Sequence, residues 1–419
     1  MNGFTNFEEM FAQSIGLEEP WRIEKAEFSQ QERAVHIYVE ARKTAKYPCP
    51  VCGEEVPRYD NEQERVWQHG DVVFFPCYVH CRRPRVKCPK CRKIHVVTAP
   101  WARERSRYTL LFEAYAMLLA EKLPLEQARK FLRISHTSLT SVVTYWVTKR
   151  VAEDDLSSVV ALCFDDTSSQ RGQSYVTIVI DAVKRRVIDV EEGRSAQQIW
   201  DFSLKLEGKG GDCGKITQVA SDMSSAYLRG IRDCFPNAQI VIDRFHVSKL
   251  MRDAMDEVRR EEQGAKFSRN RRSGKKLLMI PQGRMDEQQQ NKLAEISKLY
   301  PKTGRAFRMV QSLDEVYKCS DITQAGVMFD KLYTWLRRSR LEPMKRVALT
   351  LLQHKDEILA FYHHRLTNAI AEGINSIIQA GKRKARGFAT FRGFSTMIYL
   401  ETAKLDFAPI NLFPSFSRS

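Results

Sequence analysis

The sequence predicts a multidomain α/β protein, and three observations indicate that fold class. Clustered cysteines lie within the first hundred residues, helical periodicity follows them, and strand-like segments alternate with helix-like segments from residue 161 onward. At roughly 150 residues per domain, 419 residues correspond to two or three domains. We expect the following parts: a cysteine-rich, metal-binding module at 1–100, three helices at 101–155, an α/β domain at 156–250 and 362–410, and a helical insertion at 251–361.

The charge balance narrows the class of partner. Lysine and arginine outnumber aspartate and glutamate by 67 to 51, which gives a formal net charge of +16. Such an excess suits a polyanion, because cationic side chains neutralise phosphates and release counterions; a basic protein without a nucleic-acid partner is the alternative. A hydrophobic content of 43% excludes a wholly disordered chain. There is no apolar run of about 18 residues and no secretory leader, so we expect a cytoplasmic protein with no membrane partner.

The cysteines indicate a metal site. Six of the ten lie within residues 49–91, and two C-P-x-C turns stand out among them. Each turn directs two thiolates toward one point, so the two turns together predict a tetrahedral Zn²⁺ site. The predicted ligands are Cys49, Cys52, Cys88 and Cys91. Buried free cysteines are the alternative.

The segment between the two turns is expected to form the short strands of a zinc ribbon, because apolar residues alternate at Val72, Phe74 and Val79. Cys77 and Cys81 are four residues apart and share one strand face, a poor geometry for one metal, so we expect packed thiols. Basic residues near the second turn are predicted to contact phosphates of DNA, or else to form a solvated face. They are Arg82, Arg83, Arg85 and Lys87.

Three amphipathic segments after residue 100 predict a helix-turn-helix. Apolar residues recur three and four apart over 108–122, Pro124 opens a short helix at 125–132, and a longer helix follows at 138–151. In that layout, polar residues near the start of the last helix face base edges or phosphates. They are Ser135, His136, Thr137, Ser138 and Thr140. Three-helix packing also occurs without DNA, so the pattern alone leaves both readings open.

Residues 161–250 alternate between strand and helix patterns. The expected order is strands at 161–166, 174–183 and 185–192, a helix at 195–206, a strand at 215–222, a helix at 224–235, and a strand running into a helix at 238–250. Three hairpin-linked strands followed by helix, strand, helix, strand and helix is the order of a ribonuclease-H-like fold. That fold is a mixed sheet with helices on both faces.

Two of these strands end in carboxylates. Asp165 closes the first strand and Asp222 closes the fourth, and in a ribonuclease-H-like sheet the two strands are neighbours. We therefore expect the two carboxylates to share a pair of Mg²⁺ or Mn²⁺ ions that stabilise the attacking and leaving oxygens of a phosphoryl displacement. A third carboxylate has to come from elsewhere in the chain, and Glu372 is the candidate.

Four blocks carry a family resemblance. CFDDTSSQRGQSYVTIVIDAVKRRVIDV, VASDMSSAY, IVIDRFHVSKL and LTNAIAEGINSIIQAGKRKARGFATFRGF occur in that order. Together they resemble the catalytic blocks of DDE transposases of the ISL-three insertion-sequence family, and the cysteine turns and helix-turn-helix resemble its DNA-binding end. The resemblance carries the family's two aspartates onto Asp165 and Asp222 and its glutamate onto Glu372. Asp166 stands where the family more often has glutamate, and on a strand it points to the face opposite Asp165.

The DRFH block adds two residues that resemble family positions near the site. Asp243 is a strand-end carboxylate before a helix, which is also an ordinary N-cap, so we expect capping rather than metal ligation. His246 follows on the first helical turn, where a structural or substrate-contacting role is more usual than that of a base. The resemblance implies that metal activates the attacking water and then the DNA 3′-OH.

The remaining segments are helical or basic. Helical spacing at 251–262, 286–300, 322–339 and 344–361 predicts an all-helical insertion, and the basic stretch at 267–284 is expected to be an exposed loop that contacts DNA or is merely solvated. After residue 372, basic residues interleave with four aromatic rings, which either grip DNA and stack on unpaired bases or fill the core. The basic residues are Lys382, Arg383, Lys384 and Arg386; the rings are Phe388, Phe391, Phe394 and Tyr399.

Together these expectations describe a transposase that binds terminal inverted repeats and catalyses metal-dependent strand cleavage and strand transfer. Its partners would be double-stranded DNA, both terminal repeats and target, and further copies of itself in a homodimer or higher homo-oligomer. It would act in the bacterial cytosol, associated with the nucleoid. A catalytically silent DNA-binding regulator derived from a transposase is the alternative, and a nuclease that cleaves without joining strands would share the same site.

Overall fold

The structure, a computed structural model, describes residues 7–168, 175–264, 271–364, 369–385 and 387–407. Its contacts divide the chain into two units, residues 1–150 with 405–419 and residues 151–404. Across the described ranges, every helix is too short or too polar to span a bilayer.

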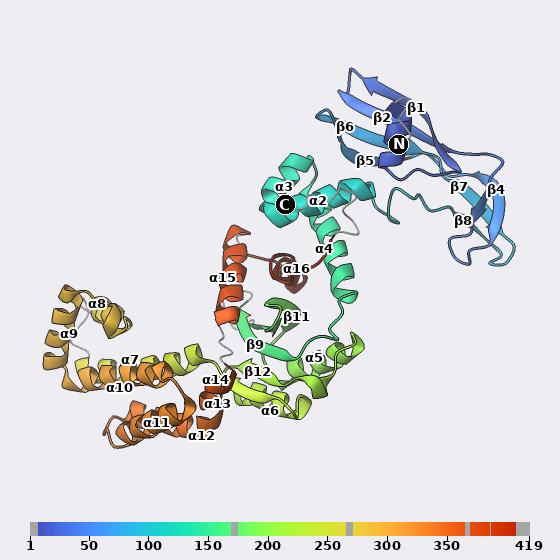
Figure 1. The fold of residues 1–419 in the computed structure, drawn as a ribbon. Coiled ribbons are helices and arrows are strands. Elements are labelled where there is room, and N and C mark those ends of the chain that lie inside the picture. Colours follow the sequence, from blue (N-terminus) through green and yellow to red (C-terminus); the bar gives the residue numbers. More distant parts are fainter. Residues whose placement is uncertain (1–6, 169–174, 265–270, 365–368, 386, 408–419) are drawn as a thin grey trace. The chain divides into compact units, whose positions relative to one another are not determined.

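The first unit contains a four-stranded sheet built around an aromatic core (Figure 1). In spatial order its strands are β1 (Trp21–Ser29), β2 (Ala34–Ala41), β6 (Phe75–Cys81) and β5 (Arg65–Val72). Strands β2 and β6 are parallel, and the other neighbours are antiparallel. Alternate residues of these strands, including Ile37, Trp67 and Val79, pack with Trp101 in the core beside helix α1 (Phe7–Ser14).

A second four-stranded sheet carries the cysteine turns. Its strands, in spatial order, are β3 (Lys46–Pro48), β4 (Glu55–Asn61), β7 (Pro84–Cys88) and β8 (Lys93–Val96). The prediction that Val72, Phe74 and Val79 lie on zinc-ribbon strands was therefore wrong. Hairpin β5–β6 belongs to the first sheet, because Val79 and its neighbours need an apolar core that the small zinc-ribbon sheet does not supply. Phe74 lies in the turn between β5 and β6 rather than on a strand.

The predicted helix-turn-helix is present as α2 (Leu110–Lys122), α3 (Leu125–Leu132) and α4 (His136–Ala152). The Thr109 hydroxyl accepts a hydrogen bond from the Phe112 amide and caps α2. Arg133 ends α3 in the left-handed conformation. The Ser135 hydroxyl then accepts from the Ser138 amide at 3.1 Å, so α4 begins two residues earlier than its apolar periodicity indicates.

The second unit is built on a five-stranded mixed sheet. In spatial order its strands are β11 (Arg186–Glu192), β10 (Tyr175–Asp181), β9 (Ala161–Ser168), β12 (Gln218–Ser221) and β13 (Gln239–Ile242). Strands β9, β10 and β11 are antiparallel neighbours, whereas β12 and β13 run parallel to β9. This is the predicted sheet, with the first and fourth strands side by side.

Helices cover both faces of that sheet, as expected (Figure 1). One face packs through Phe164 against α5 (Ala196–Gly208) and α6 (Ser225–Cys234). The other packs through Ile178 against α15 (Ala369–Lys384) and α16 (Phe391–Thr402). Strand β9 is the central strand of the sheet, so its alternate residues face opposite helix layers.

Between β13 and α15 the described residues are helical apart from short connections, which confirms the predicted insertion. Its helices are α7 (Arg244–Gln263), α8 (Arg271–Leu278), α9 (Glu287–Leu299), α10 (Pro301–Lys318), α11 (Ile322–Arg337), α12 (Glu342–Gln353), α13 (Lys355–Leu359) and α14 (Phe361–His364). The expectation of a loop over 267–284 was wrong for residues 271–278. They form α8, because Leu277 and Leu278 are buried in the core of the insertion. Residues 267–270 lie outside the described ranges.

Candidate active site and metal centre

Three aspartates lie in register across three parallel strands. Asp222 and Asp243 directly follow β12 and β13, but the expectation that Asp165 closes its strand was wrong, because pairing with β10 continues β9 to Ser168. Cys163 of β9 pairs with Ala220 of β12, and Ser221 of β12 pairs with Ile242 of β13. Continuing this register places Asp165, Asp222 and Asp243 in one row across the sheet. Because the carboxyl ends of parallel strands meet at one edge, the sequence alone brings these acids together once the strand order is fixed.

Asp165 is buried and faces α15. Its Oδ1 accepts a hydrogen bond from the Asp166 amide at 2.8 Å, and its Oδ2 accepts one from Asn375 Nδ2 at 2.6 Å. Burial raises the pKa of this carboxyl to about 6, although the Asp166 amide opposes the shift. Asp166 points the other way and lies 3.6 Å from an Arg194 nitrogen. The two neighbours therefore occupy opposite faces of β9, as the strand pattern predicts.

Asp222 and Asp243 lie beside His246. Burial raises the pKa of Asp222, while the Ser224 amide and the charge of His246 oppose that shift. Asp243 caps α7 by accepting from the Phe245 amide at 2.9 Å, and its other oxygen accepts from His246 Nδ1 at 2.8 Å. The hydrogen bond to Asp243 raises the pKa of His246. The capping role expected for Asp243 is confirmed, and His246 lies beside the acids.

Glu372 lies in the first turn of α15 and is exposed. Three residues later Asn375 contacts Asp165, Gln379 Nε2 donates to Thr167 Oγ1 at 2.9 Å, and Lys382 Nζ donates to the Ser168 carbonyl at 2.7 Å. Helix α15 therefore runs alongside β9 in the same direction. Residues three and seven positions apart share one flank of a helix, so Glu372 extends this row one turn before Asn375.

Asn375 and Gln379 were not predicted from the sequence as site residues. Their spacing of three and seven from Glu372 was the available signal, since it places all three on one side of a helix. Of the basic residues near them, Lys382 is bound to β9, whereas Arg383 and Lys384 are exposed. Arg386 lies outside the described residues.

The aromatic residues after Glu372 fill the core. Phe394 is completely buried in the cluster between the sheet and α15 and α16, and Phe388, Phe391 and Tyr399 pack against that cluster. The Tyr399 hydroxyl also lies 3.2 Å from Asp189 Oδ1 of β11. Of the two readings offered by the sequence, the structure supports core packing for these rings.

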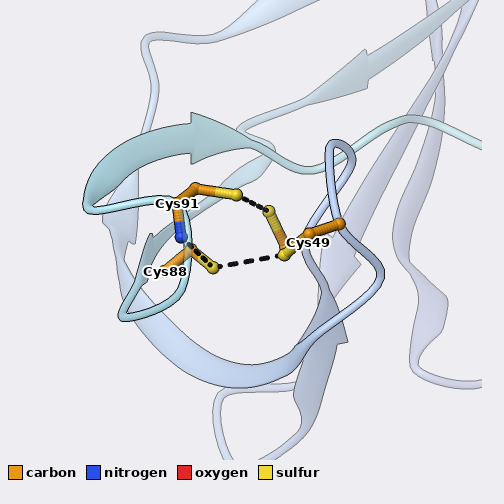
Figure 2. A group of neighbouring side chains, drawn as sticks. Cys49, Cys88 and Cys91 are labelled. Atoms are coloured by element: carbon orange, nitrogen blue, oxygen red, sulfur yellow. Dashed lines mark hydrogen bonds between the residues drawn. The ribbon is translucent and has the colours of Figure 1, made fainter.

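The four predicted zinc ligands converge in the second sheet of the first unit. All four sulfur atoms lie within 4.8 Å of one another, with Cys49 Sγ 3.9 Å from Cys91 Sγ and Cys52 Sγ 3.5 Å from Cys88 Sγ. Figure 2 shows the side chains of Cys49, Cys88 and Cys91 meeting between the two turns. Zn–S bonds of about 2.3 Å in a tetrahedron place sulfurs roughly 3.8 Å apart, so the arrangement fits Zn²⁺.

The thiol pKa values agree with a shared metal site. Burial raises the pKa of Cys49, but hydrogen bonds from the Val51 and Cys52 amides outweigh it and bring the pKa to about 7. Contact with Cys52 raises the pKa of Cys91 to about 12, because neighbouring thiols cannot all ionise without a cation. Cys77 and Cys81 are buried on one face of β6, and burial raises the pKa of each to about 12. They are packed thiols, as predicted.

Two of the predicted phosphate-binding arginines are paired within the chain. Arg83 Nε lies 2.5 Å from Glu62 Oε1, and Arg85 Nε lies 2.6 Å from Asp60 Oδ1. Only 11% of the Arg83 side chain is exposed, so its charge is largely neutralised in place. Arg82 and Lys87 are exposed.

The polar residues of the helix-turn-helix lie at the start of α4. His136 and Thr137 are exposed, and Ser138 and Thr140 are half-buried. His136 Nδ1 lies 3.4 Å from Thr140 Oγ1, which keeps the imidazole along the helix flank. The described geometry thus presents a polar helix start suited to reading a groove.

Comparison with known proteins finds matches along most of the chain. Residues 162–398 match a family described as "Transposase", residues 97–147 match the "Helix-turn-helix domain of transposase family ISL3", and residues 46–91 match the "zinc-finger of transposase IS204/IS1001/IS1096/IS1165". The transposase for insertion sequence element IS1001 of Bordetella parapertussis is 25% identical over 384 residues, which cover 90% of this chain and 94% of that protein. The transposase for IS1557 of Mycobacterium tuberculosis H37Rv is 23% identical over 426 residues, covering 94% and 95%.

Proposed function

Because this chain belongs to the ISL3 family of transposases, we propose that it binds the terminal inverted repeats of an insertion sequence and cleaves and transfers DNA strands there. The observation that carries the proposal is the row of acids across the sheet, in which Asp165 contacts α15. Asp165 and Asp222 come from neighbouring strands, and Glu372 comes from the helix that contacts Asp165.

The residues present fit divalent cations. Carboxylate and amide oxygens are the ligands that Mg²⁺ and Mn²⁺ prefer, and burial raises the pKa of both Asp165 and Asp222. Among the described residues, the group with three or more possible ligand atoms within 4.8 Å of one another is the four cysteines, so the acids are not drawn together around a single point. Asn375 Oδ1 is buried without a hydrogen-bond partner, so an oxygen acceptor remains available on the side chain that contacts Asp165. Asp165, Asp222 and Glu372 would hold the ions. When bound, such ions supply an activated nucleophile and stabilise the leaving oxygen.

The protein's own contribution is positioning. The Asp166 amide and the Asn375 side chain fix both oxygens of Asp165, and the cap on α7 fixes Asp243 and with it His246. Preorganised charges of this kind need no rearrangement when the substrate phosphate arrives. The hydrogen bond to Asp243 raises the pKa of His246, so a protonated His246 would supply positive charge beside the acids and would face the scissile phosphate.

We propose that the first unit recognises the terminal repeat. The start of α4, with His136 and Thr137, would read the terminal repeat, and the zinc module would contact the adjacent backbone through Arg82 and Lys87. Arg383 and Lys384 of α15 would contact DNA near the acids. Joining requires two ends to be held together, so the proposal includes a homodimer or larger assembly acting on chromosomal DNA in the cytosol.

The test is Mg²⁺-dependent cleavage of labelled duplexes taken from the DNA that flanks the gene. Asp165→Asn and Glu372→Gln should bind the duplex and not cut it. Asp166→Asn is the matched control, because it changes the adjacent carboxyl on the opposite face of the same strand and should still cut.

Each other outcome rejects part of the proposal. Binding without cutting by the unaltered protein would indicate a regulator. Cutting without strand transfer would indicate a nuclease. Loss of cutting in Asp166→Asn but not in Asp165→Asn would show that the first aspartate was assigned to the wrong face.

A further inference from the structure

The tip of hairpin β5–β6 exposes two apolar side chains. Val73 is 78% exposed and Phe74 is 87% exposed, and they are the two most exposed large hydrophobic residues among those the structure describes. The Val72–Phe75 pair closes the hairpin, so the connection consists of these two residues alone. Their side chains therefore contribute little buried area to the fold.

The same two residues have an unfavourable backbone. Val73 has a φ of 49° and Phe74 has a φ of 68°, both in the left-handed region. Two-residue turns with this geometry favour Asn-Gly, because asparagine and glycine tolerate positive φ, whereas a β-branched residue there is strained. The strain is not offset by packing within the chain, because both side chains are largely exposed. A strained and exposed turn of this kind points to contact with another molecule.

Contacts fix the tip beside the turn of the helix-turn-helix. Arg133, the left-handed residue that ends α3, donates to the Phe74 carbonyl at 3.3 Å and lies 3.4 Å from Asp71 Oδ2. Earlier on β5, Gln68 Nε2 donates a hydrogen bond to the Leu132 carbonyl at 3.3 Å. Gln68 also exchanges backbone hydrogen bonds with residues 107 and 109, ahead of α2. The tip therefore has a fixed position just before α4 begins.

The surroundings of the tip suit a duplex. Phe75 packs edge-on against Phe28 with ring centroids 4.9 Å apart, which supports the tip from below. The exposed cations Arg33 and Arg133 flank it, and the Arg33 guanidinium lies over the Phe75 ring. Of the nearby acids, Asp71 is paired with Arg133. The result is an apolar point with the exposed Arg33 on one flank and the Arg133–Asp71 pair on the other, next to the polar start of α4.

We propose that Val73 and Phe74 form an apolar wedge that inserts between base pairs of the duplex held by α4. This inference rests on the proposed function, because it takes DNA as the ligand of the helix-turn-helix. Proteins that kink DNA insert apolar side chains between base steps and offset the unstacking with newly buried apolar surface. A tip already held in one conformation loses little entropy on insertion, which explains why a strained turn is useful here.

The test replaces the wedge with the residues that the turn prefers. In Val73→Asn/Phe74→Gly the fold should be as stable as before or more stable, while the Kd for a duplex flanking the gene rises about ten-fold or more. The duplex carries 2-aminopurine at successive positions, and the fluorescence increase that marks an unstacked base should disappear. Phe74→Leu should retain both binding and unstacking.

Two controls isolate the wedge. Leu299→Asn removes an apolar side chain that is 72% exposed on α9 of the other unit, and should change neither readout. Thr137→Ala should weaken binding but leave the fluorescence increase intact at saturating protein. Unstacking and affinity are thereby measured apart.

The outcomes separate this inference from the proposed function. If the unaltered protein binds the duplex and Val73→Asn/Phe74→Gly binds and unstacks it equally well, the wedge is rejected and the transposase proposal stands. If the double variant alters the sedimentation of the protein but not its DNA binding, the tip is a protein contact and the wedge is again rejected. If the unaltered protein binds no flanking duplex, the proposed function fails and the wedge fails with it.

Discussion

A buried glutamate holds the helix-turn-helix to the segment that precedes it. Glu113 of α2 is fully buried, and both of its oxygens accept from Arg103 Nε at 2.8–2.9 Å. The Ser106 hydroxyl donates to Oε1 at 2.5 Å, and Trp146 Nε1 of α4 donates to Oε2 at 2.8 Å. One carboxylate thus joins the entry segment, α2 and α4.

Replacing Glu113 with methionine keeps the length of the side chain and removes its charge. Arg103, Ser106 and Trp146 would then lose their acceptor in the interior. Removing one partner of a buried ion pair costs about 3–5 kcal/mol. We expect about 3 kcal/mol, at the lower end, because 18% of the Arg103 side chain is exposed and its guanidinium also lies 4.2 Å from the centre of the Tyr145 ring.

Amide hydrogen exchange of the full chain measures this loss of stability locally, in α2 and α4. About 3 kcal/mol corresponds to roughly a hundred-fold faster exchange of the protected amides in α2 and α4 of Glu113→Met. Amides of α10, in the other unit, should be unchanged. In Arg103→Met/Glu113→Met much of the protection should return, because no charge is left unpaired. Glu121→Met, on the same helix, is the control. Exchange in α4 within about three-fold of the unaltered protein would refute the reasoning, since roughly a factor of ten is already 1.4 kcal/mol.

Three further predictions concern the metal site, the acids and the insertion. Cys88→Ser should lose zinc, whereas Cys77→Ser should retain it, because Cys77 is a packed thiol outside the cluster. Metal analysis of the two purified variants measures this, and equal zinc content in both would contradict the site. In Mg²⁺-free buffer the second unit should lose stability as the pH rises through about 6, because burial raises the pKa of Asp165 from 3.8 to about 6 and the folded state favours the protonated acid. That stabilisation is complete below 3.8 and is lost above about 6, so Asp165→Asn should flatten the profile; an unchanged slope in urea unfolding would count against it. Gly304→Ala should destabilise the insertion by about 1–3 kcal/mol, because the new Cβ would lie 2.7 Å from Ser297 Cβ and 2.9 Å from its Cα; a thermal transition at the unaltered temperature would disprove the clash.

Local patterns were sufficient wherever neighbouring residues decide the outcome. Pro124 and the polar residues after it predicted the helix-turn-helix, because caps and periodicity act within one or two turns. The neighbouring positions of Asp165 and Asp222 followed from the order of strands and helices, since few topologies accommodate that order.

The pairing between strands that are distant in the sequence could not be predicted from such local patterns. Alternation at Val72, Phe74 and Val79 indicated strands but carried no information on their partner, and β6 pairs with β2, far away in the sequence. Phe74 fits the alternation and nevertheless lies in the turn, because positive φ at a residue other than glycine leaves no mark in the sequence. The aromatic residues after Glu372 were equally ambiguous until the sheet face that they cover was known.

Single side-chain contacts in the candidate site were also not predictable when they depend on tertiary packing. The spacing of Asn375 and Glu372 fixes their common side of a helix but not what lies opposite. That Asn375 contacts Asp165 depends on how α15 packs across β9 through Ala371, Ile374 and Ile378, a tertiary contact between residues on either side of the insertion.

The second unit is completed late in translation, because parts of one domain lie on both sides of the helical insertion. Strands β9 and β10 are synthesised early, yet the helices that cover one of their faces, α15 and α16, are translated only after the whole insertion. A nascent or prematurely terminated chain therefore holds Asp165 and Asp222 without Glu372, and its uncovered sheet exposes Ile178 and Ile180 to solvent. Such a fragment lacks the third carboxylate of the proposed transposase site, and its bare apolar face favours aggregation. If Glu372 completes the proposed site, a partial product of translation would hold the two aspartates and could not cut DNA.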